Sequence, residues 1–125
     1  MRSYNPDKAP DPDEWLEMDE SERISLVESY HRRNRIHLPN VLLHSTVQVI
    51  VENQLAMKDP VVTENLGRLQ KEGLSRHDAI HAIAGVQTER LFRIMKGNKP
   101  ESPEVESEIY EKQLRKLTAG KWLRL

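Results

Sequence analysis

The sequence contains no cysteine, few aromatic residues and no long apolar run. Without cysteine the chain can form no disulfide bond, no thiolate zinc site and no cysteine nucleophile. No segment approaches the roughly 20 apolar residues of a membrane-spanning helix, and the first ten residues show no secretory signal. We therefore expect a cytoplasmic protein that does not cross a membrane.

The chain also lacks an excess of either charge, since 19 basic and 20 acidic residues give a net charge of -1. A nucleic-acid-binding protein usually carries a basic excess on one face. The local cluster of Arg32, Arg33 and Arg35 is better explained as a solvated helix end, where cations complement the helix dipole. The charge balance therefore argues against nucleic acid as a partner.

The chain has 125 residues, a length that fits one domain with its own core. Helical patterns cover most of it. Apolar residues recur with a period near 3.6, and no alternating pattern of the kind found in strands survives beside it. Pro-rich residues 1–12 predict an extended N-terminal arm. The expected helical segments are a short turn over 12–16 and helices over about 20–34, 39–57, 60–72, 76–95 and 103–117. We predict an all-α fold, a compact bundle of about five helices with mostly antiparallel neighbours, forming a single domain over residues 1–125.

Capping residues mark several of the helix ends. Asp19 and Ser75 are each followed three positions later by an acidic residue, which is the spacing of a capping box. Gly73 suits the left-handed conformation that ends many helices. Gly120 is expected to end the last helix and to leave an apolar tail, residues 120–125, that should dock on the bundle.

Two of the apolar helices carry lines of polar side chains spaced four residues apart. These side chains are Asn40, His44, Gln48 and Glu52 on one helix and His77, His81 and Glu89, with Gly85 between them, on the other. At 100° per residue, the two histidines of the later helix fall in the middle of its apolar face. A buried polar group without a partner costs about 1–3 kcal/mol, so we expect the two lines to meet. An antiparallel arrangement pairs His44 with Glu89 and Glu52 with His81, or with His77 after a shift of one turn.

Three interpretations of these lines remain open. One is a structural His–Glu hydrogen-bond network that sets the helix register. The second is a divalent metal site for zinc, iron or manganese, in which His77 and His81 form a bidentate pair and Glu52 completes the set. His44 and Glu89 would be further ligands or would form hydrogen bonds to the ligands. The third is metal-free acid/base chemistry by a His–Glu pair.

Our leading hypothesis is a small cytoplasmic helical-bundle protein whose buried His/Glu centre binds a divalent metal ion. The sequence identifies no reaction and no substrate. The alternative is a non-enzymatic interaction module, in which the polar lines are structural and the arm or the tail around Trp122 binds a partner or a second copy of the chain. His31, one helical step beyond Ile24 and Val27, could approach the same centre, but we expect it to be a surface histidine or a hydrogen-bonded core histidine.

Several motifs carry a resemblance to a known family. They are Trp15-Leu16, Asp19-Glu20, Glu22-Arg23, Tyr30-His31, Leu38-Pro39-Asn40, His44, Val51-Glu52-Asn53-Gln54, Gly73-Leu74 and Arg76-His77 with His81. Through them the chain resembles a bacterial family of short helical proteins of unknown function, over most of residues 12–96. The resemblance implies a helical fold with His44, Glu52, His77 and His81 at its centre, and it implies no activity. Family members often have a second histidine where this chain has Gln48, which weakens a metal site here because glutamine is a poor ligand.

Overall fold

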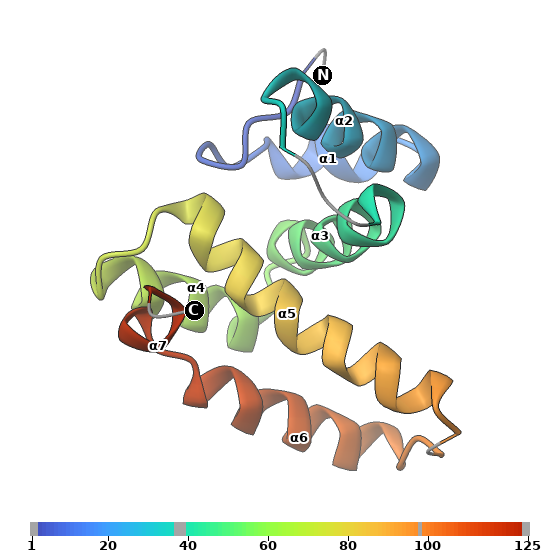
Figure 1. Ribbon diagram of the computed structural model, residues 1–125, viewed down its shortest axis with the longest axis vertical. Coiled ribbons are helices and arrows are strands. Elements are labelled where there is room, and N and C mark those ends of the chain that lie inside the picture. The colour runs from blue at the N-terminus through green and yellow to red at the C-terminus, as the bar shows by residue number, and fades with distance from the viewer. Residues whose placement is uncertain (1–2, 37–39, 98, 124–125) are drawn as a thin grey trace. The chain divides into compact units, whose positions relative to one another are not determined.

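The computed structural model describes residues 3–36, 40–97 and 99–123, and its regular structure is entirely helical over those residues. The all-α prediction is confirmed. The chain divides into two compact units, Met1–Asp59 and Pro60–Leu125, whose helices can be followed in Figure 1. Among the described helices, none is both long enough and apolar enough to span a membrane.

The first unit consists of a non-helical arm and three helices. These are α1 (Pro12–Glu17), α2 (Glu20–Arg33) and α3 (Val41–Ala56). Both α1 and α2 pack against α3 (Figure 1). α3 begins at Val41 because the side chain of Asn40 caps it, accepting a hydrogen bond of 3.0 Å from the amide of Leu43. The helix therefore starts two residues later than predicted, and Pro39 lies outside the described residues.

The core of the first unit contains one buried apolar side chain from the arm and one from each of its three helices. Tyr4 of the arm, Trp15 of α1, Val27 of α2 and Val49 of α3 are buried together. The ring of Tyr4 lies 5.7 Å from that of Trp15. Burying such a side chain fully stabilises the folded state by about 1.5–3 kcal/mol. Since Tyr4 is buried in this core, the arm is part of the folded unit. Leu16, the next residue of α1, is 38% exposed.

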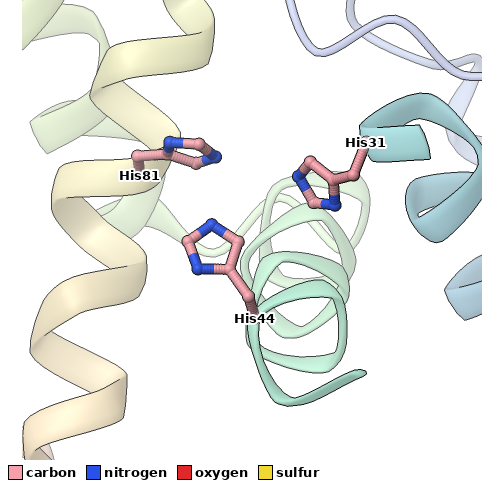
Figure 2. A group of neighbouring side chains, drawn as sticks. All are labelled: His31, His44 and His81. Atoms are coloured by element: carbon pink, nitrogen blue, oxygen red, sulfur yellow. The ribbon is translucent and has the colours of Figure 1, made fainter. Parts of the chain in front are cut away.

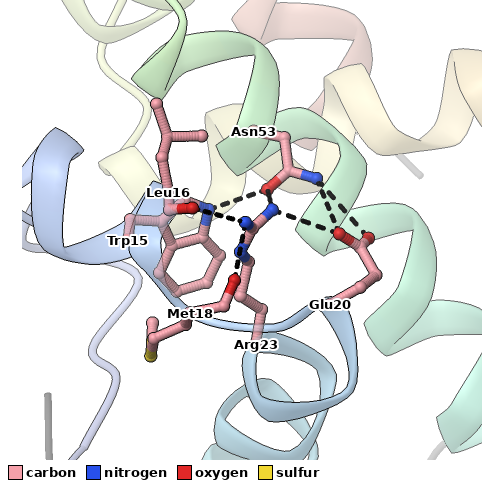
Figure 3. Close-up of polar contacts among 6 residues, drawn as sticks. All are labelled: Trp15, Leu16, Met18, Glu20, Arg23 and Asn53. Atoms are coloured by element: carbon pink, nitrogen blue, oxygen red, sulfur yellow. Dashed lines mark hydrogen bonds and ion pairs between the residues drawn. The ribbon is translucent and has the colours of Figure 1, made fainter.

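A polar network closes the junction of the three helices (Figure 3). The indole Nε1 of Trp15 donates to Oδ1 of Asn53 over 2.8 Å, and Arg23 Nη1 donates to the same oxygen over 3.0 Å. Arg23 Nη2 also donates to the carbonyl oxygens of Leu16 and Met18. Since carbonyls at a helix C-terminus lack partners within the helix, the guanidinium caps α1 while it binds α3.

The second unit consists of α4 (Pro60–Lys71), α5 (Arg76–Met95), α6 (Pro103–Lys116) and the short α7 (Ala119–Leu123). α4 contacts both α5 and α6, and α6 runs back beside α5 (Figure 1). The buried apolar side chains of this unit include Val62, Leu66, Leu69, Leu74, Ile80, Ile83, Val86 and Leu114. Val105, near the start of α6, is 40% exposed.

One ion pair, between Arg68 of α4 and Glu72 just after it, contacts the end of α6 and the start of α7. Arg68 donates to the carbonyl oxygens of Leu114 and Leu117 over 3.0 and 2.9 Å. Nη1 of Arg68 also contacts Glu72 over 2.7 Å, and the other carboxylate oxygen of Glu72 accepts from the amide of Ala119 over 3.0 Å. Arginine and glutamate thus satisfy the unpaired groups of two successive helix ends.

Two of the predicted helix ends are confirmed and two are corrected. Ser75 accepts a hydrogen bond from the amide of Asp78, and Gly73 has a φ of 112°. Asp19 stands at the N-cap of α2 but forms no side-chain cap bond. Gly120 does not end a helix: α6 ends before it, and Gly120 lies inside α7. The physical reason is Thr118, whose hydroxyl caps α7 by accepting from the amide of Lys121.

Candidate metal centre

Two histidines of α5 face each other within the second unit. His77 and His81 stand four residues apart, so one helical turn places them on the same face. Their Nε2 atoms lie 3.1 Å apart, with ring centroids at 4.3 Å and planes inclined by 70°. Both side chains are half-buried. The prediction that these two imidazoles form a close pair at the apolar face of the helix is supported by this geometry.

A second histidine pair lies within the first unit, between α2 and α3. The rings of His31 and His44 are 5.4 Å apart, and a ring nitrogen of each lies within 4.8 Å of the other. Figure 2 shows His31 and His44 reaching toward one another from their helices; His81, also drawn there, belongs to the second unit. His31 is fully buried and His44 is half-buried. The contact links α2 to α3 through His31.

Ser45 orients the buried ring of His31. The Nδ1 atom of His31 lies 3.1 Å from the hydroxyl of Ser45, the residue that follows His44 on α3. When Nδ1 carries the proton and donates it to Ser45, Nε2 keeps the lone pair that a metal ion would use. Histidines that bind metals are commonly held in this way through their other ring nitrogen. His31 is therefore a hydrogen-bonded core histidine, one of the two outcomes expected for it.

Tyr30 adjoins this pair, with its ring 5.9 Å from that of His31. Burial raises the pKa of Tyr30 above its usual value of 10.0, and the nearby carboxylate of Asp7 raises it further. The phenol therefore stays protonated at neutral pH. A protonated phenol is a poor metal ligand, so imidazole nitrogens are the ligand atoms that this part of the first unit offers.

Glu52 lies at the other end of α3, buried to 1% exposure. Its Oε2 accepts a hydrogen bond from the hydroxyl of Tyr4, and Gln48 Nε2 donates to the same hydroxyl over 3.1 Å. Both Tyr4 and Gln48 are also buried. Gln48, where the resembling family often has histidine, thus has a structural role in this chain as a donor to the arm.

The predicted ligand set spans both units. His44 and Glu52 lie on α3, while His77, His81 and Glu89 lie on α5, where Glu89 is exposed. The predicted pairing of the two lines therefore joins the two units, and it stays a prediction. Within each helix the predicted ligands are widely spaced: eight residues rise about 12 Å, so His44 and Glu52 stand about two turns apart on α3. The same rise separates Glu89 from His81.

Tyr4 and Ser45 are residues of these sites that sequence reasoning missed. Tyr4 lies in the proline-rich arm, where no periodic pattern indicates a buried face. Ser45 follows His44 directly, and helical spacing alone does not reveal a partner on another helix. A tyrosine isolated in an otherwise polar arm was the available signal for Tyr4, because a large aromatic residue gains most from burial.

No protein-family model matches the chain, and no curated protein or solved structure matches it either. The function of the chain is therefore inferred from the geometry of its histidines and of the surfaces around them.

Proposed function

We propose that this protein binds a divalent metal ion through imidazole nitrogens, with His77 and His81 of α5 as the chelating pair. The observation that carries the proposal is the distance of 3.1 Å between their Nε2 atoms. In a tetrahedral zinc site with Zn–N bonds of about 2.0–2.1 Å, two ligand nitrogens stand about 3.3 Å apart. The pair therefore needs little rearrangement to bind an ion.

The chemistry of the ligands selects among the expected metals. Imidazole nitrogens suit zinc, copper, iron and nickel, whereas manganese favours carboxylate oxygens. The chain offers no thiolate, because it has no cysteine. Among zinc, iron and manganese, zinc fits a histidine pair best. The carboxylate of Glu52 as a further ligand is a proposal that rests on the sequence pattern alone.

A hydrogen bond between the two imidazoles is the competing explanation of the same distance. A neutral His77 could donate an N–H to the lone pair of His81, or the reverse, at 3.1 Å. In that case the pair would be structural, as the first interpretation of the polar lines has it. The two explanations differ in their dependence on metal, so a metal measurement separates them.

The experiment is metal analysis of protein purified without a histidine tag or nickel resin. We expect close to one zinc ion for each protein chain. This zinc should be absent from a His77→Ala, His81→Ala double variant. Zinc should be titrated into the metal-free protein, and either single substitution should lower the affinity for zinc about tenfold or more. Substituting residues that only hydrogen-bond to metal ligands already lowers metal affinity by that factor. Gln70→Ala, at an exposed position of α4, is the control for the effect of a substitution outside the pair.

Lowering the pH supplies a second readout, because imidazole must be deprotonated to bind a metal. Zinc should leave the wild-type protein on acidification and return on neutralisation. A His77→Gln, His81→Gln variant, which keeps hydrogen-bonding side chains, serves if the alanine variant fails to fold. Equal zinc content in wild type and in these variants, or no zinc binding by the folded wild type, contradicts the proposal.

A further inference from the structure

The second unit contains a groove between α5, α6 and α7, whose lining on α5 begins at the residue that follows the imidazole pair. Its volume is about 420 Å³, which lies in the range of small-molecule sites, about 300–1,000 Å³. Ala82, Gly85 and Val86 of α5 form one wall, and Leu117 and Trp122 contribute further apolar surface. The groove is therefore large enough for a flat, mostly apolar molecule.

Gly85 makes room in the middle of this groove. It lies inside α5, is exposed, and a Cβ added there would meet nothing within 4 Å. The neighbouring wall residues Ala82 and Val86 are also small. With small side chains on α5 and the indole of Trp122 on α7, the groove offers an aromatic surface against which a flat ring can pack.

The charges beside the groove are unequal. Lys116 of α6 and Lys121 of α7 are exposed cations among its lining residues, and Glu89 of α5 is the acid among them. Lysine side chains lay their apolar stems along such surfaces and keep the ammonium group at the rim. A ligand that combines an apolar body with one negative charge matches this arrangement.

The α7 wall is held in place by the rest of the unit. The amide of Ala119 at the start of α7 donates to Glu72, and Arg68 binds both Glu72 and the carbonyl of Leu117. Trp122 is therefore presented by a helix tied to α4. A surface that is already ordered before the ligand arrives loses little conformational entropy on binding. A flexible tail would have to become ordered, which would lower the affinity.

We propose that this groove binds a small monoanion with a flat apolar body, such as an aromatic carboxylate, with the ring against Trp122 and the carboxylate toward Lys116 and Lys121. The proposal goes beyond metal binding and does not depend on it. It also assigns a small-molecule ligand to the Trp122 region, for which the sequence suggested docking on the bundle or the binding of a partner or a second copy.

The test is an NMR titration of the whole chain with 2-naphthoate and, as its uncharged counterpart, 2-naphthalenemethanol. We expect 2-naphthoate to shift the indole signal of Trp122 and the amide signal of Gly85. The signal of Trp15, which is fully buried in the first unit, serves as the internal reference and should not move. The alcohol should bind at least fivefold more weakly.

Three variants locate the binding. Lys116→Gln with Lys121→Gln should weaken 2-naphthoate at least fivefold, whereas Lys71→Gln with Lys112→Gln removes the same charge from exposed positions outside the groove and should have no effect. Gly85→Leu should block the groove without unfolding the helix, which circular dichroism will check.

The proposal would be overturned by no shift at millimolar 2-naphthoate, by equal binding of the alcohol, by equal weakening by both lysine pairs, or by binding that EDTA abolishes. The last result would assign the carboxylate to a histidine-bound metal. Self-association of the chain that Trp122→Ala removes would assign the groove to a second copy, and this too would overturn the proposal.

Discussion

The hydroxyl of Tyr4 donates a hydrogen bond of 2.5 Å to Oε2 of Glu52, across 48 residues of the chain. Both groups are buried, and Gln48 donates to the same hydroxyl. The bond ties the N-terminal arm to α3 and gives a polar partner to a carboxyl group that lies in an apolar core. The arm therefore contributes to the stability of the first unit through a specific contact as well as through burial.

Removing this hydroxyl should destabilise the first unit. Tyr4→Phe keeps the ring in the core but takes a donor from Glu52 and an acceptor from Gln48, so we expect the free energy of unfolding to fall by about 1–3 kcal/mol. Urea denaturation measures the change. Repeating the substitution in a Glu52→Gln background should give a smaller loss, because the bond to a neutral amide is weaker. Equal losses in both backgrounds would show that Glu52 is not the partner that matters.

The junction around Asn53 gives a second prediction (Figure 3). Asn53→Ala leaves the buried indole N–H of Trp15 and a bond of Arg23 without their acceptor. We expect a loss of about 1–3 kcal/mol, partly offset because alanine favours helix more than asparagine does. Thermal unfolding followed by Trp15 fluorescence will measure it. Gln70→Ala, at an exposed amide of α4, should change stability by less than about 0.5 kcal/mol.

Two glycines should respond to alanine in opposite directions. Gly85 lies inside α5 with open space for a methyl group, so Gly85→Ala should stabilise the second unit by about 0.5–1 kcal/mol. Gly73 has equal space but a φ of 112°, a conformation that strains any residue with a Cβ. Gly73→Ala should therefore destabilise the protein by more than Gly85→Ala stabilises it, as measured by chemical denaturation. Stabilisation by both substitutions would contradict the left-handed conformation at Gly73.

Acid should weaken the attachment of α7. The hydrogen bond from the amide of Ala119 lowers the pKa of Glu72 below its ordinary value, and Arg68 lowers it further. A carboxyl with a lowered pKa stabilises the fold fully above the ordinary glutamate pKa, about 4.3. The contribution is lost as the pH falls through the lower, folded-state pKa.

The measurement compares wild type with Glu72→Gln between pH 7 and pH 3. The difference in unfolding free energy should be constant near neutrality and should shrink below about pH 4.3. Fluorescence of Trp122, recorded in a Trp15→Phe background, should report loosening of α7 over the same range. A difference that grows on acidification would mean that the carboxylate of Glu72 does not support α7.

Local patterns were enough to predict the helices and some of their ends. α5 has the predicted bounds, Arg76–Met95. Its serine cap, its apolar period and the turn at Gly97 are each signals that act over a few neighbouring residues. The pairing of His77 with His81 was predictable for the same reason, since both lie on one turn of one helix. Signals of this kind act over three or four positions, which is the range that a sequence pattern can report.

Contacts between distant segments were decided by the tertiary structure alone. Tyr4 meets Glu52, His31 meets Ser45 and His44, and Glu72 receives the amide of Ala119 because packing of apolar side chains brings those segments together. No periodicity within one helix specifies which face of another helix it will meet, nor whether a short tail becomes a helix, as α7 does. The sequence therefore determined which imidazoles lie on a common helical face, and the fold determined what surrounds them.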